Sequence, residues 1–98
     1  MPSRSRKPGR PKGSTTFDSK SAQAFGTVLR AVRERANMSQ EELSHLAEIH
    51  RSHLSKLERG LAQPTLHAVF KLAEAFGIKP TRLVRLTLQV MNDEAPAE

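Results

Sequence analysis

The sequence contains no cysteine, no tryptophan and no tyrosine, and phenylalanine occurs only four times in 98 residues. The absence of cysteine excludes disulfide bonds and cysteine-ligated zinc sites. No apolar run approaches the ~18 residues of a membrane-spanning helix, and the basic N-terminus leads into Pro, Gly and Ser rather than an apolar segment. We therefore expect neither a spanning helix nor a secretory signal, and a cytoplasmic location.

Positive charge is concentrated at one end of the chain. The net charge is +6, and the first 16 residues contain no acidic residue but five basic ones: Arg4, Arg6, Lys7, Arg10 and Lys12. A basic surface of this density favours a polyanionic partner, with nucleic acid ahead of an anionic membrane surface.

Composition divides the chain into three segments. Residues 1–16 are rich in Pro, Gly and like charges, so we predict a disordered basic arm. Residues 17–91 hold 33 of the 36 apolar residues, enough for one small core. Residues 92–98 are acidic and predict a short frayed tail.

Apolar residues recur at spacings of three and four between the two tails, and no stretch alternates as a strand would. The pattern predicts an all-α fold of five helices. Ser39 and Glu42 have the spacing of a capping box, Gly60 and Gly77 mark helix ends, and Thr65 caps a fourth helix. The predicted helices follow Asp18, Ser39, His50, Thr65 and Pro80. The apolar residues expected on the second and fourth helices include Leu46 and Leu66.

Nothing in the sequence favours catalysis. No nucleophile, base and orienting residue form a recognisable set, and one small core leaves little room for a substrate cleft. Four histidines occur, at His45, His50, His53 and His67, but no acidic residue joins them at a metal-ligand spacing. We expect no enzyme activity, no metal and no cofactor.

Two short helices joined by a tight turn, with one helix before and two after, are the layout of a helix-turn-helix DNA-binding domain. The segment SQEELSHLAEIHRSHLSKLERG, residues 39–60, closely resembles the Cro/phage-repressor type (XRE-like) helix-turn-helix family. The resemblance extends over residues 25–87 and includes the stretch KLAEAFGIKPTRLVRL. It implies sequence-specific binding of double-stranded DNA.

The residues themselves favour the same function. Ser39 and Gln40 lie at a predicted helix N-terminus, which attracts phosphate. The third helix presents polar and basic residues away from Leu54 and Leu57, as a helix in the major groove does. By resemblance, base edges are contacted by Arg51, Ser52, Ser55 and Lys56, while the DNA backbone or the flanks of the site are contacted by Gln40, His50, His53 and Arg59.

The resemblance also implies an ion pair between Arg33 and Glu58 that ties the first helix to the end of the third. The sequence departs from the family at two positions, because Glu48 replaces the usual glycine of the turn and Ser44 replaces an alanine. Glu48 must therefore adopt a left-handed conformation, or the turn must differ. We also expect its charge to face approaching phosphates.

The arm contains Lys7-Pro8-Gly9-Arg10-Pro11-Lys12-Gly13, which resembles an AT-hook. In that interpretation Arg10 enters the minor groove of A·T-rich DNA, and the alternative is a polybasic tether without sequence preference.

The last helix, Thr81 to Met91, has more apolar residues than one face of a small domain buries. We predict a homodimer with Leu83, Leu86 and Val90 at its interface.

The favoured function is a transcriptional regulator, more specifically a repressor, associated with the nucleoid. An antitoxin or a restriction-modification controller is an alternative within the same fold. An adaptor that binds a protein or a membrane surface, and does not read DNA, is an alternative from a different class.

Overall fold

The computed structural model describes residues 17–93, which form five α-helices and no strand. The helices are α1 (Ser19–Arg35), α2 (Gln40–Ala47), α3 (Arg51–Glu58), α4 (Leu66–Phe76) and α5 (Pro80–Asp93). This confirms the predicted all-α architecture. The basic arm, including Arg10, and residues 94–98 lie outside the described residues.

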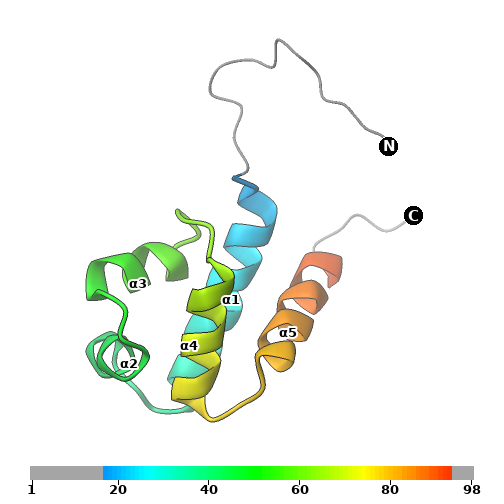
Figure 1. Cartoon of the computed structure of the whole chain (residues 1–98). Helices are drawn as coiled ribbons and strands as arrows, with labels where there is room; N and C mark the ends of the chain where they lie inside the picture. The colour runs from blue at the N-terminus through cyan, green and yellow to red at the C-terminus, as the bar shows by residue number, and fades with distance from the viewer. Residues whose placement is uncertain (1–16, 94–98) are drawn as a thin grey trace, which may run out of the picture.

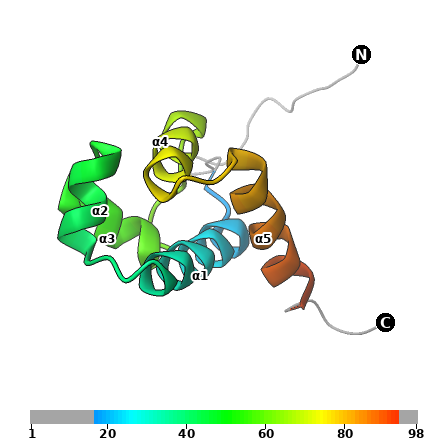
Figure 2. The same cartoon turned by 90° about the horizontal axis from the view of Figure 1, so that it is seen from below.

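Helix α1 lies in the middle of the fold. Figures 1 and 2 show α2 and α3 on one side of α1 and α5 on the other, with α4 packed between them. Helices α3 and α5 therefore lie on opposite flanks of α1. The N-terminus of α1 is capped by Asp18, whose carboxylate accepts a hydrogen bond from the backbone N–H of Ser21.

The start of α2 follows from its sequence. The hydroxyl of Ser39 accepts a bond from the Glu42 N–H at 3.0 Å, and the Glu42 carboxylate accepts one from the Ser39 N–H at 2.8 Å. This reciprocal arrangement is the predicted capping box. Thr65 caps α4 in a similar way, accepting from the Ala68 N–H at 2.9 Å.

All five helices contribute to a single apolar core. Its fully buried large side chains are Leu29, Leu43, Leu54, Leu57, Leu72 and Leu83. Two of the apolar positions expected in these helices lie outside the core, since Leu46 is 55% exposed and Leu66 is 68% exposed. In the short α2 only Leu43 and Ala47 are buried, and in α4, which begins at Leu66, the buried residues are Ala68, Val69, Leu72 and Ala73.

Helix α5 differs from its prediction in two respects. It continues through Asp93, two residues into the segment predicted as a frayed tail, because neither Asn92 nor Asp93 breaks a helix. Leu83 is fully buried in the chain's own core, so its assignment to a dimer interface is wrong. Leu86 and Val90 are half-buried against the same core, and the exposed apolar residues of α5 are Val84 and Leu88.

No helix within residues 17–93 is both long and apolar enough to cross a membrane.

Candidate nucleic-acid interface

Helix α3 has one buried face and one polar face. Leu54 and Leu57 are completely buried and fix the helix in the core. The residues predicted to contact DNA lie on the remaining surface: His50, Arg51, Ser52, His53, Lys56 and Arg59 are exposed, and Ser55 is half-buried. The structure therefore brings the predicted residues of this helix together on one surface.

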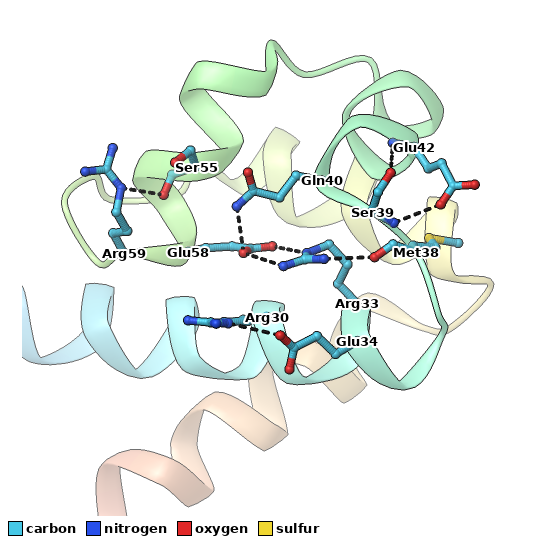
Figure 3. Close-up of polar contacts among 10 residues, drawn as sticks. All are labelled: Arg30, Arg33, Glu34, Met38, Ser39, Gln40, Glu42, Ser55, Glu58 and Arg59. Carbon is cyan, nitrogen blue, oxygen red and sulfur yellow. Dashed lines mark hydrogen bonds and ion pairs between the residues drawn. The ribbon is translucent and has the colours of Figure 1, made fainter.

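The cations of α3 are available to an external partner. None of Arg51, Lys56 and Arg59 forms an ion pair with a carboxylate of residues 17–93. Arg59 donates from Nε to the Ser55 carbonyl oxygen at 3.3 Å, which leaves its terminal nitrogens for other acceptors (Figure 3). A face with unpaired guanidinium and ammonium groups attracts a polyanion.

The only carboxylate of α3 is Glu58, and it faces the interior of the domain. Arg33 of α1 donates to Glu58 from both Nε and Nη2, the latter at 3.0 Å, and from Nη1 to the Met38 carbonyl oxygen at 2.8 Å. The two side chains are 12% and 4% exposed. Hydrogen bonding to Glu58 raises the pKa of Arg33 above its usual value, despite the opposing effect of burial. The ion pair implied by the family resemblance is thus present and nearly buried.

Gln40 has a partner that the sequence did not reveal. Its side-chain amide nitrogen donates to Glu58 Oε1 at 3.0 Å, so α2 joins α1 in holding the end of α3 (Figure 3). Ser39, next to it, uses its hydroxyl oxygen in the capping box. Both residues lie at the N-terminus of α2, where the first backbone N–H groups have no acceptor within the helix.

In the turn between α2 and α3, Glu48 adopts the left-handed conformation, which is the first of the two expected alternatives. Glu48 has φ +58°, a conformation in which most side chains are strained. Its carboxylate lies 2.6 Å from Nζ of Lys71 on α4, and this hydrogen bond lowers the pKa of Glu48 and raises that of Lys71. The charge of Glu48 is therefore paired with a cation. No pattern in the sequence linked these two residues, because Glu48 lies in the turn after α2 and Lys71 lies 23 positions later on α4.

No three histidine, aspartate or glutamate side chains within the described part of the chain lie close enough to hold a metal ion.

Burial of the Arg33–Glu58 pair predicts that removing one partner lowers the free energy of unfolding. Arg33→Ala leaves the Glu58 carboxylate buried without its partner, and we expect the free energy of unfolding to fall by about 3 to 5 kcal/mol. The matched control is Arg30→Ala, because Arg30 pairs with Glu34 in the same helix at an exposed site and should contribute less than about 1 kcal/mol. Thermal melts that coincide for the two variants would contradict this assignment.

The conformation of Glu48 makes a second prediction. Glu48→Gly removes the left-handed strain, and we expect the midpoint of thermal unfolding to rise by a few degrees. Glu48→Ala is the control, because it also loses the Lys71 pair but keeps a Cβ atom at positive φ. An equal change in both variants would show that the ion pair, rather than the backbone, determines the effect.

Comparisons with known proteins agree with this geometry. The family model described as Helix-turn-helix matches residues 29–83, more than half of the chain. The control protein C.BamHI of Bacillus amyloliquefaciens is 36% identical over 64 residues, which cover 64% of this chain and 79% of that protein. The HTH-type transcriptional regulator y4dJ of Sinorhizobium fredii is 32% identical over 71 residues, covering 72% of this chain and 86% of the regulator.

A solved structure has the same arrangement of helices. The restriction-modification controller protein C.AhdI from Aeromonas hydrophila superposes with a TM-score of 0.62 at 37% sequence identity. The match covers 63% of this chain and 94% of that protein. The resemblance predicted from residues 39–60 is confirmed, and the chain belongs to the helix-turn-helix family.

Proposed function

We propose that this chain is a transcriptional regulator that binds a double-stranded DNA operator as a homodimer, with α3 in the major groove. The observation that supports it most is the exposed face of α3, whose cations have no carboxylate partner within residues 17–93 while its one carboxylate is buried against Arg33. The regulators among the relatives support the same function.

Specific roles follow from position on α3. Arg51, Ser52, Ser55 and Lys56 contact base edges, because guanidinium and ammonium groups donate to guanine acceptors and the short serines allow close approach. His50, His53 and Arg59 contact the DNA backbone at the flanks of this surface. Exposure of six of these seven residues, and partial exposure of Ser55, supports this assignment.

The N-terminus of α2 is proposed to bind a phosphate. Its unpaired backbone N–H groups and the positive end of the helix dipole favour an anion there. Gln40 retains a second amide hydrogen beyond the one donated to Glu58, and the Ser39 hydroxyl retains its proton. Both can therefore donate to a phosphate without breaking a bond within the protein.

Control of a restriction-modification system is the second candidate. Its specific support is the 37% identity to C.AhdI, which is named as a restriction-modification controller protein, together with the 36% identity to the control protein C.BamHI. The genes next to the coding sequence distinguish this role from general repression, since a controller is expected beside a nuclease and a methyltransferase gene.

Helix α5 is proposed to form the dimer interface. Val84 and Leu88 are exposed on it, although removing large apolar side chains from water is energetically favourable. Leu86 and Val90, also on α5, line a groove of about 570 Å³ between α1 and α5, together with Val32 and Ile78. Because α5 lies on the opposite side of α1 from α3, a second copy can cover this surface without obstructing the recognition helix (Figure 2).

The assignment of α3 predicts altered base preference. Arg51→Ala and Lys56→Ala should each weaken operator binding by about 1 to 3 kcal/mol and relax the choice of base at one position. Lys79→Ala removes one exposed cation from the connection between α4 and α5, so it should leave base preference unchanged. Titration against a panel of single-base operator variants measures both effects. Unchanged preferences in both α3 variants would mean that another surface contacts the bases.

If α5 forms the dimer interface, a substitution that prevents dimerisation should also weaken operator binding. Leu88→Lys places a charge on the exposed surface of α5, so we expect a monomer at tens of micromolar and weaker operator binding. Leu46→Lys is the matched control, because Leu46 is 55% exposed and Leu88 51%, but Leu46 lies on α2. Analytical ultracentrifugation that finds the wild-type chain monomeric would contradict the proposal.

A further inference from the structure

The backbone of α1 directly contacts the C-terminal end of α3, and Gly26 lies at the point of contact. A Cβ atom at Gly26 would lie 2.5 Å from the carbonyl oxygen of Leu57 and 2.6 Å from that of Glu58. Both are backbone atoms, which cannot rotate away as a side-chain end does. No residue other than glycine fits here unless the two helices move apart.

A second glycine, at the end of α3, also lies close to α1. Gly60, which follows α3 with φ +72°, lies against Gln23 of α1, and a Cβ atom there would be 2.8 Å from Cγ and 2.9 Å from Cα of Gln23. Arg33 binds Glu58 further along α1. The end of α3 is therefore held by two glycine contacts and an ion pair along one face of α1.

The distance between α1 and this end of α3 determines how α3 is tilted. The other end of α3 is joined to α2 by the tight turn at Glu48, and Leu54 and Leu57 hold the middle in the core. Lys56, proposed to contact a base edge, and Arg59, proposed to contact the DNA backbone, lie within one residue of Leu57 and Glu58, so both move with this end of α3. Hydrogen bonds to base edges tolerate displacements of only about 0.5 Å.

We propose that Gly26 and Gly60 are positioning residues for DNA recognition: because they lack side chains, α3 packs close to α1, and this packing directs the base-contacting residues of α3 at the bases. This rests on the proposed function of α3. Phosphate contacts by flexible cations tolerate a small tilt, whereas base contacts do not. The two glycines should therefore influence sequence discrimination more than overall affinity for DNA.

Gly26→Ala in the full-length chain tests this directly. The added methyl group must displace the end of α3 by at least about 0.5 Å to restore an allowed contact of 3.0 Å. The probes are a duplex enriched from a random pool by the wild-type chain and a scrambled duplex of the same composition. We expect the ratio of the two affinities to fall about tenfold, while affinity for the scrambled duplex and its salt dependence stay unchanged.

A matched pair of substitutions keeps the test decisive if Gly26→Ala does not fold. Gly60→Asn and Gly77→Asn introduce the same residue at φ +72° and φ +73°, where asparagine is tolerated better than other side chains, but a Cβ atom at Gly77 meets nothing within 4 Å. We expect Gly60→Asn to lower the affinity ratio and Gly77→Asn to leave it at the wild-type value. Circular dichroism verifies the fold of each variant.

A folded Gly26→Ala or Gly60→Asn variant that keeps the wild-type affinity ratio would overturn the proposal, even if its melting temperature falls. Equal losses in Gly60→Asn and Gly77→Asn would overturn it as well, because they would trace the effect to general strain. Failure of the proposed function is recognised separately: substitutions of Arg51 and Lys56 would then leave base preference unchanged in an otherwise wild-type chain.

Discussion

The buried carboxylate of Glu58 is the constraint on which the arrangement of the first three helices depends. A carboxylate that is 4% exposed is tolerated only when hydrogen bonds and an opposite charge compensate for lost water, and here they come from Arg33 of α1 and Gln40 of α2. Arg33 also binds the Met38 carbonyl oxygen, just before α2. One carboxylate thus joins α1, α2 and α3 (Figure 3). Its burial keeps negative charge away from the outer face of α3, where Arg51 and Lys56 form no ion pair with a carboxylate of residues 17–93.

Local signals in the sequence were sufficient for most of the fold. The capping box at Ser39 and Glu42, the Thr65 cap and the left-handed Gly77 involve residues close together in the chain, so spacing alone predicts their geometry. Because the family has glycine at this position, Glu48 was expected either to adopt a left-handed conformation or to change the turn, and its φ of +58° confirms the first alternative. The Arg33–Glu58 pair is distant in sequence, and it was predicted only because the family resemblance supplied the fold.

Features that depend on how helices face one another were not predictable from periodicity. Leu83, Val84 and Leu88 are equally apolar in the sequence, yet packing of α5 against α1 and α4 buries the first and exposes the others. The Lys71 partner of Glu48 and the Glu58 partner of Gln40 required the relative placement of separate helices. Gly26 gave no local signal at all, because its role arises from the backbone of α3 beside it. The contacts of Gly26 and Gln40 lie at the C-terminal end of α3. The geometry of the candidate site was therefore less predictable from the sequence than the fold was.

Selection of bound duplexes from a random pool by the full-length chain tests the central claim, that α3 of two copies reads a DNA sequence, most directly. A dimer with one α3 in each of two major grooves predicts an enriched inverted repeat, with half-site centres about 10 base pairs, or roughly 34 Å, apart. Failure to enrich any motif above the starting pool, under salt conditions in which the chain binds DNA, would contradict sequence recognition by α3. Enrichment of a single unrepeated half-site would contradict the homodimer.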